Sequence, residues 1–193
     1  MADIIFCSFP KTERPKDFSI NVATIFKTHL ASISTVDLAK GLESDEVLET
    51  LRPDLEALGF EVEKSKKKID KIHRPVFFGD NGEPTVSYEI DAFHKDWKCG
   101  LEIEAGRAWM GNAVYRDLVQ SLVMAELEHL ILAVPQTYKY NSNGKPLISK
   151  DYENAKNLID TIFSHTRFRL PYSLTLIGDR KSTRLNSSHL VIS

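Results

Sequence analysis

The sequence predicts an α/β fold, a three-layer sandwich in which helices cover both faces of a mixed central sheet. Segments with helical and strand-like apolar spacing follow the order helix, three strands, helix, strand, which is typical of this class. The continuous apolar run at 129–134, stopped by Pro135, indicates a strand buried on both faces. With 193 residues, 42% of them apolar, the chain can bury such a core as one domain without disulfides or metals.

Two helices are expected before the first strand. Apolar residues spaced by three and four predict a helix over 17–30, with Asp17 as its N-cap. A second helix is expected over 44–58, with Ser44 as its N-cap and without a complete capping box. Pro53 should kink or divide that second helix.

The rest of the chain is expected to alternate strands and helices around a basic loop at 64–74. The expected strands are 60–63, 86–93, 99–105, 129–134 and 173–177, and the expected helices are 112–126 and 150–163. These elements divide a single domain, 1–178, into a helical N-terminal extension at 1–40, a core at 44–134, and a C-terminal helix and strand at 150–178.

Composition excludes several classes of protein. No apolar run approaches the roughly 20 residues that a bilayer span needs, and the N-terminal sequence lacks the basic and apolar regions of a signal peptide. Cys7 and Cys99 have no CxxC spacing, which argues against a zinc cluster and fits a reducing compartment. We therefore expect a cytoplasmic protein with no membrane partner.

The segment 179–193 is polar and patternless, unlike the sequence before it. It resembles the conceptual translation of a common sequencing adapter, so we expect an artefactual tail and a natural C-terminus lost after Gly178. Without this segment, 22 basic and 26 acidic residues give a net charge of −4. The overall charge therefore predicts no nucleic-acid partner, and local patches must carry any such prediction.

Two neighbouring predicted strands alternate acidic and apolar residues. Because alternate side chains share one face of a strand, Ile90 and Ala92 should face the core and Asp91 the opposite side. Across the following turn, Glu102 and Glu104 should likewise face away from the core.

The register of this predicted hairpin decides whether its acids meet. If Phe93 opposes Gly100, then Asp91 lies opposite Glu102, with Cβ atoms roughly 5 Å apart. Glu104 then follows one step further along the same face. Three carboxylates would converge on one spot.

Such a convergence is unfavourable unless a cation offsets it. Two like charges at about 5 Å repel by roughly 3 kcal/mol at an effective dielectric constant near 20. With no histidine or cysteine among the acids to make a softer site, a hard, oxygen-ligated Mg²⁺ or Mn²⁺ ion is expected. Such an ion fits phosphodiester hydrolysis. The alternative from spacing alone is a solvated acidic face on an unrelated scaffold.

The order of the elements, together with Asp91 and the motif Glu102-Ile-Glu104, resembles the PD-(D/E)xK superfamily of restriction-endonuclease-like nucleases. The resemblance covers 44–134, about half of the chain before 179. It implies a restriction-endonuclease-like fold, Mg²⁺-dependent hydrolysis of DNA, and Asp91, Glu102 and Glu104 as the acids of the motif.

Some features depart from the family's pattern. No proline precedes Asp91, and Glu104 stands where most members carry lysine, although some restriction enzymes of the BamHI type also have Glu-x-Glu. The family often adds an acid from the first core helix. Glu49 and Glu56, seven residues apart on one helix face, are the candidates, and Glu56 joins the expected metal ligands.

Basic side chains near the predicted site are candidates for contact with DNA. The segment 64–74 holds six basic residues and one acid, which fits either a patch along a phosphate backbone or a solvated loop. Arg107, just after the acids, is expected to hold the scissile phosphate. Arg116 and Gln120, four residues apart on the next helix, are neighbours that could face substrate, and an ion pair or a packing role is the alternative for Arg116.

Together these observations predict a Mg²⁺- or Mn²⁺-dependent DNA endonuclease of a restriction or DNA-defence type. Asp91 and Glu102 are the expected metal ligands, and Glu104 completes the site or orients the attacking water. Restriction enzymes often act as dimers, which leaves a homodimer open, although no pattern identifies an interface. The lysine that Glu104 replaces favours an alternative, a non-catalytic nuclease-fold module that binds nucleic acid or a protein partner.

Overall fold

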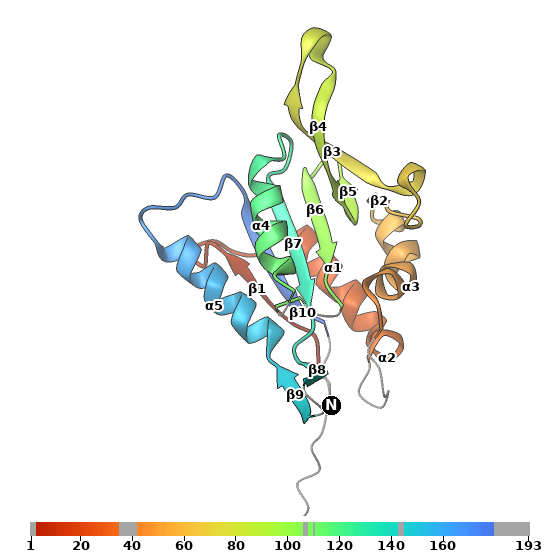
Figure 1. Ribbon diagram of the computed structural model, residues 1–193, viewed down its shortest axis with the longest axis vertical. Helices are drawn as coiled ribbons and strands as arrows, with labels where there is room; N and C mark the ends of the chain where they lie inside the picture. The colour runs from red at the N-terminus through yellow and green to blue at the C-terminus, as the bar shows by residue number, and fades with distance from the viewer. Residues whose placement is uncertain (1–2, 35–41, 106–107, 110, 143–144, 180–193) are drawn as a thin grey trace, which may run out of the picture.

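The structure is a computed structural model that describes residues 3–34, 42–105, 108–109, 111–142 and 145–179. Its centre is a mixed sheet with the strand order β1-β10-β7-β6-β5-β2 (Figure 1). The neighbours β10, β7 and β6 run parallel, whereas β1, β5 and β2 each pair antiparallel with their neighbours. The strands of this sheet are β1 (Ile5–Phe9), β2 (Glu61–Val62), β5 (Ala92–His94), β6 (Cys99–Ile103), β7 (His129–Val134) and β10 (Ser173–Gly178).

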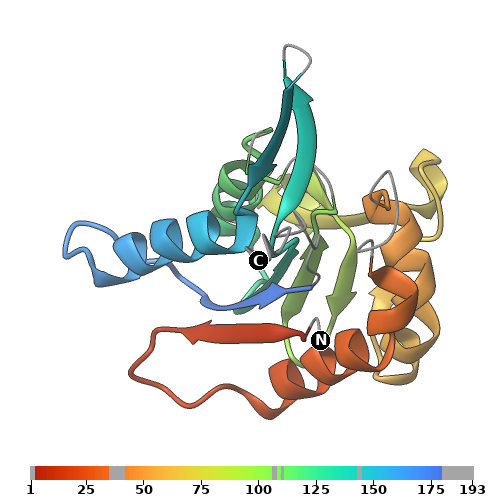
Figure 2. The ribbon, with the colours of Figure 1, turned by 90° about the horizontal axis from the view of Figure 1, so that it is seen from below.

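Helices pack on both faces of this sheet, as the sequence predicts. One core joins α1, α2 and α3 to residues such as Leu101 and Ile131, and a second core joins α4 and α5 to residues such as Leu130 and Leu132. Figure 2 shows α1 and α3 grouped apart from α4 and α5. The helices are α1 (Asp17–Thr28), α2 (Leu30–Ile33), α3 (Ser44–Ala57), α4 (Ala113–Val123) and α5 (Asp151–Ser164). The chain is thus an α/β protein with a mixed sheet, and β7 is buried throughout.

Two antiparallel hairpins stand apart from the central sheet. The arm formed by β3 (Ile72–Phe78) and β4 (Pro84–Ile90) projects from the body beyond the end of α4 (Figure 1). The second hairpin, β8 (Tyr138–Ser142) and β9 (Lys145–Ser149), projects from the body at the top of Figure 2. The first three residues of β3, 72–74, replace the end of the expected basic loop, and the base of the arm borders the site described below.

The expected strand at 86–93 is divided at Asp91, which corrects the predicted hairpin. Ile90 packs in the core under α4, whereas Ala92 packs in the core under α1 and α3. The two side chains therefore do not share a face, because the chain bends at Asp91 between β4 and β5. The bend gives the carboxyl group of Asp91 access to the main chain of β6.

The start of α3 also differs from the sequence prediction. Glu43, not Ser44, is the N-cap, and Glu43 and Glu46 form a complete capping box. Ser44 accepts a hydrogen bond from the N–H of Ala105 instead, which ties α3 to the end of β6. Pro53 lies inside the helix without dividing it, since the buried face of α3 continues on both sides of the proline.

Both ends of the described chain join the sheet. β1, which lies within the expected helical extension, pairs with β10 and places the N-terminal segment at the sheet edge. Of the segment expected as a tail, only Asp179 is described, and its N–H donates to the carbonyl of Val134 at 3.0 Å. The rest, 180–193, lies outside the described residues. Among the helices that are described, none has the length and apolar character to cross a bilayer.

Candidate metal-binding site

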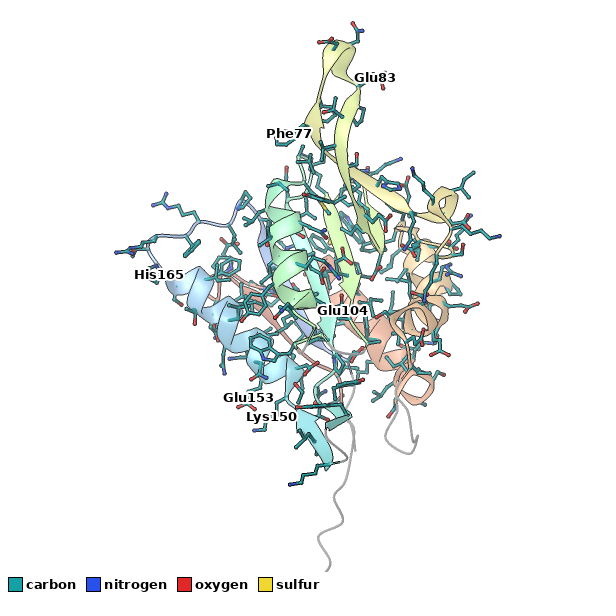
Figure 3. All side chains as sticks on the ribbon, viewed as in Figure 1. Phe77, Glu83, Glu104, Lys150, Glu153 and His165 are labelled. Carbon is teal, nitrogen blue, oxygen red and sulfur yellow. The ribbon has the colours of Figure 1, made fainter. Side chains whose placement is uncertain are left out.

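A polar cavity of about 490 Å³ lies between the base of the β3–β4 arm, β6 and α4. Acids from four parts of the chain share this cavity with a lysine, an arginine and a glutamine. Its lining residues are Glu63, Lys71, His73, Ser87, Tyr88, Glu89, Ile90, Asp91, Glu102, Arg116, Asp117 and Gln120. Figure 3 shows Glu104 where β6 ends, beside α4.

The register of β5 and β6 brings the predicted acids together. Phe93 pairs with Gly100 as the sequence argument required, and Ala92 pairs with Leu101. Asp91, one residue before this ladder, accepts a hydrogen bond on Oδ2 from the N–H of Ile103 at 2.8 Å. The Asp91 carboxyl group is thereby fixed beside β6, on the strand that carries Glu102.

Glu102 is buried at the wall of the cavity and is not part of a solvated acidic face. The residue is only 9% exposed. Burial raises the pKa of its carboxyl group well above the usual value, and the nearby carboxylates of Asp91 and Asp117 raise it further. The interpretation of the hairpin as an ordinary surface hairpin therefore does not hold at Glu102.

Two further acids share this unfavourable environment. Burial raises the pKa of Asp91 to about 7, against the lowering effect of the Ile103 hydrogen bond. Burial likewise raises the pKa of Glu104 to about 7, and the carboxylate of Asp117 adds to the increase. Each group therefore favours either a proton or a bound cation over an isolated negative charge.

Asp117, on the inward face of α4, belongs to the same cluster and was missed in the sequence. It is 1% exposed, and burial raises its pKa to about 6 although Arg116 lowers it. Its Oδ1 accepts a hydrogen bond from Nε of Arg116 at 3.0 Å. With the acids ionised, its buried Oδ2 has no hydrogen-bond partner among the described residues, whereas a proton shared with Glu104 would supply one.

Arg116 joins the two acids at the α4 side of the site. Its Nη2 donates to Oε1 of Glu104 at 2.7 Å, in addition to the contact with Asp117. Gln120, one turn along α4, lines the same cavity. Arg116 and Gln120 therefore line a common cavity, and Arg116 forms the ion pairs that were the alternative to a contact with substrate.

A second ion-pair group, also missed in the sequence, occupies the opposite side of the cavity. Nζ of Lys71 lies 2.7 Å from Oε1 of Glu63 and 3.6 Å from Oε2 of Glu89. The N–H of Glu63 donates to the carbonyl of Asp91 at 2.8 Å, so this group adjoins the predicted acids. Lys71 was predicted only as one member of a basic loop.

The other residues predicted for the site are Glu49, Glu56 and Arg107. Glu49 and Glu56 are exposed on α3, and neither is among the described residues that line the cavity. The acid that supplements the hairpin in this chain comes from α4 instead, because Asp117 occupies the face of that helix that packs on the sheet. Arg107 lies outside the described residues.

The chemistry of the cluster fits a hard divalent cation. The donors are carboxylate oxygens, and Oδ2 of Asp117 is a buried oxygen in need of a positive partner. Lys71 pairs with Glu63 and Glu89 while Arg116 pairs with Glu104 and Asp117, so among the described residues Asp91 and Glu102 are the acids of the cluster that have no ion pair.

The described side chains do not form a complete coordination sphere for a metal ion. Among the described residues, no group of three or more histidine, cysteine or acidic side chains is arranged to hold a metal ion. Oxygens of Asp91 and Glu104 instead accept hydrogen bonds from Ile103 and Arg116. Rotation of carboxyl groups about their side-chain bonds would accompany binding of an ion.

No protein-family model and no curated protein matches the chain in sequence comparisons.

Proposed function

We propose that the chain is a Mg²⁺- or Mn²⁺-dependent DNA endonuclease with a restriction-endonuclease-like fold. One observation carries the proposal: Asp91, Glu102 and Asp117 line one cavity, Arg116 links Glu104 to Asp117 beside it, and burial raises the pKa of all four acids. A divalent ion relieves that repulsion more effectively than protons do at neutral pH. Clustered carboxylates with this character are found more often at functional sites than elsewhere.

Asp91 and Glu102 would hold the ion, with Glu104 or Asp117 as a further ligand. When bound, the ion would lower the pKa of a water molecule and stabilise negative charge on a phosphate group. The other residues of the cavity act on the substrate directly. Arg116 and Gln120 offer N–H donors to phosphate oxygens from α4.

Hydrolysis joins the oxygen of a water molecule to phosphorus and breaks one ester P–O bond, and the departing oxygen takes up a proton. We assign to Glu104 the role of accepting the proton that the attacking water loses. Its pKa of about 7 allows it to bind and release a proton near neutral pH. In this role Glu104 would replace the lysine that most family members have at this position, because a carboxylate with a raised pKa is a competent general base.

Contact with DNA outside the cavity would come from the loop before the arm. Lys67 and Lys68 are exposed there, next to the strand whose base lines the cavity. Exposed lysines of this kind bind phosphates without regard to sequence, and their contribution weakens as salt concentration rises. We therefore propose DNA as the substrate class.

The test is cleavage of a supercoiled plasmid by the purified chain in Mg²⁺ or Mn²⁺. We expect nicked or linear product that chelator abolishes, and a loss of about 100-fold or more in the rate for Asp91→Asn and for Glu102→Gln. Asp96→Asn is the matched control, because Asp96 is an exposed acid in the turn of the same β5–β6 hairpin. Equal rates for the native chain and both site variants would exclude the proposal.

A second candidate is a module that binds nucleic acid without cutting it. The hydrogen bonds from Ile103 and Arg116 favour it, because they satisfy oxygens of Asp91 and Glu104 without a metal ion. Calorimetric titration with Mn²⁺ separates the two candidates. Heat that disappears in Glu102→Gln favours the nuclease, whereas salt-sensitive DNA binding with no Mn²⁺ affinity favours the module.

A further inference from the structure

We propose that the ammonium group of Lys71 occupies the place of a second divalent cation, so that this site binds a single metal ion. The inference rests on the proposed function, since it presupposes that Asp91 and Glu102 bind a first ion. It assigns to Lys71 and Glu63 a role that the basic sequence around them does not indicate.

The fold separates Lys71 from its basic neighbours. Asp70 anchors the turn before it, because its Oδ2 accepts a hydrogen bond from Ser65 at 2.5 Å and its carbonyl accepts one from the N–H of Lys64 at 3.3 Å. Lys67 and Lys68 remain exposed, whereas the side chain of Lys71 is only 20% exposed and lines the cavity. Lys71 thus belongs to the acidic site, unlike Lys67 and Lys68.

The contacts of Lys71 resemble those expected of a bound cation. Its Nζ contacts Oε1 of Glu63 at 2.7 Å and lies 3.6 Å from Oε2 of Glu89. The Glu63 side chain is 6% exposed, so the ion pair is largely withdrawn from water on that side. The link from the N–H of Glu63 to the carbonyl of Asp91, 2.8 Å long, keeps the pair next to the expected metal ligands.

Electrostatics keep the lysine charged in this position. Burial lowers the pKa of Lys71, but the carboxylates of Glu63, Glu89 and Asp91 together raise it above the usual value. The same positive charge lowers the pKa of Asp91. Lys71 therefore stabilises the ionised form of an expected metal ligand, as a neighbouring metal ion would.

Removal of the ammonium group should convert the pair of carboxylates into a metal site. Glu63 and Glu89 would then face each other across a space that carries no positive charge of its own, beside the ionised Asp91. Divalent ions bind at sites with as few as one or two carboxylates and complete their coordination with water. The variant Lys71→Met keeps an unbranched apolar side chain, one atom shorter than lysine, and removes the charge and the hydrogen-bond donors.

The experiment measures the number of Mn²⁺ ions bound per chain by isothermal calorimetry, with electron paramagnetic resonance to detect coupling between neighbouring ions. We expect one ion in the native chain and in Lys71→Arg, and two in Lys71→Met. Adding Glu63→Gln to Lys71→Met should return the number to one. Lys68→Met is the matched control, since Lys68 is exposed in the same basic run, and it should bind one ion.

The outcomes separate this inference from the proposed function. Two ions in the native chain, or one ion in both the native chain and a folded Lys71→Met, would overturn the role of Lys71 while leaving the metal site intact. No Mn²⁺ bound by either chain would overturn the proposed function and the inference with it. Melting temperatures in chelator establish that each variant is folded, and Lys71→Gln replaces Lys71→Met if the latter does not fold.

Discussion

The N–H of Ile103 donates a 2.8 Å hydrogen bond to Oδ2 of Asp91. This bond joins the bend between β4 and β5 to the middle of the sheet, and it determines where the first acid of the cluster lies. It uses one carboxyl oxygen and leaves the other available to a cation. The bond therefore gives Asp91 a structural role that can be separated by mutation from its charge.

Asp91→Asn should keep the fold and lose the charge. The amide oxygen of asparagine can still accept the bond from Ile103, whereas the repulsion among the buried acids falls. At pH 8 in chelator we expect the free energy of unfolding to rise by roughly 1–3 kcal/mol, because the pKa of Asp91 is about 7 and its ionised form is unfavourable there. Urea denaturation measures this change.

Asp91→Ala is the comparison, since it removes the acceptor as well as the charge. It should be less stable than Asp91→Asn by about 1–3 kcal/mol, the cost of an unpaired buried N–H. If Asp91→Asn proved less stable than the native chain under these conditions, the repulsive acid cluster would be the wrong description of the site.

Local sequence patterns indicate much of the candidate site. The convergence of the acids was conditional on the pairing of Phe93 with Gly100, and the structure has this pairing. In a hairpin, turn length and alternation together set the register. The same alternation misplaced Ala92, because a bend that follows from a side-chain hydrogen bond has no periodic signal.

The acids and the lysine that complete the cluster depend on tertiary packing. Asp117 could have been found, because it lies three residues after Val114 and four before Ser121, both buried on the inward face of α4. An acid at such a position signals a buried charge that needs a partner. Lys71 gave no comparable signal, because one lysine in a basic run looks like the others until the chain turns at Asp70.

The stability of the protein in chelator should fall as pH rises from about 4 to about 7. The folded-state pKa values of Asp91, Glu104 and Asp117 are about 7, 7 and 6, above those of unfolded carboxyls. Their stabilising effect is fully present below the unfolded pKa and is lost as pH passes the folded pKa, since the folded state binds more protons in this interval.

The titration of His129 changes stability in the opposite direction and therefore determines the pH interval in which the effect of the acids is best measured. Burial lowers its pKa to about 4, so its contribution is present above pH 6.5 and is lost as pH falls toward 4. Between pH 6.5 and 7.5 the acids alone should therefore cause the decline. Denaturation midpoints across this interval test it, and saturating Mn²⁺ should flatten the decline. A midpoint that rises with pH in chelator would contradict the prediction.

Arg116→Gln should destabilise the site and make it depend more on metal. The substitution removes the cation between Glu104 and Asp117 and leaves the buried Asp117 carboxylate without its hydrogen bond from Nε. Because Arg116 is half exposed, we expect a loss of only ~1–2 kcal/mol at pH 8. Adding Asp117→Asn should recover part of that loss in a double-mutant cycle. Simple additivity of the two changes would show that the side chains are not coupled.

Gly100→Ala should disturb the cluster from its own face of the sheet, because Gly100 and Glu102 are two residues apart on β6. A Cβ at this position would lie 2.3 Å from Cδ1 of Ile90 and 2.8 Å from Cδ1 of Leu127, so Ile90, the residue before Asp91, must move. We expect a loss of about 1–3 kcal/mol in stability from overpacking, together with weaker Mn²⁺ binding. Ile90→Val removes the nearer of the two atoms, because valine has no Cδ1. The double variant Gly100→Ala/Ile90→Val should therefore regain Mn²⁺ affinity relative to Gly100→Ala, although contact with Leu127 remains. If the second change restored stability but not Mn²⁺ affinity, the position of Asp91 would not depend on Ile90, and the bend would be held by the bond from Ile103 alone.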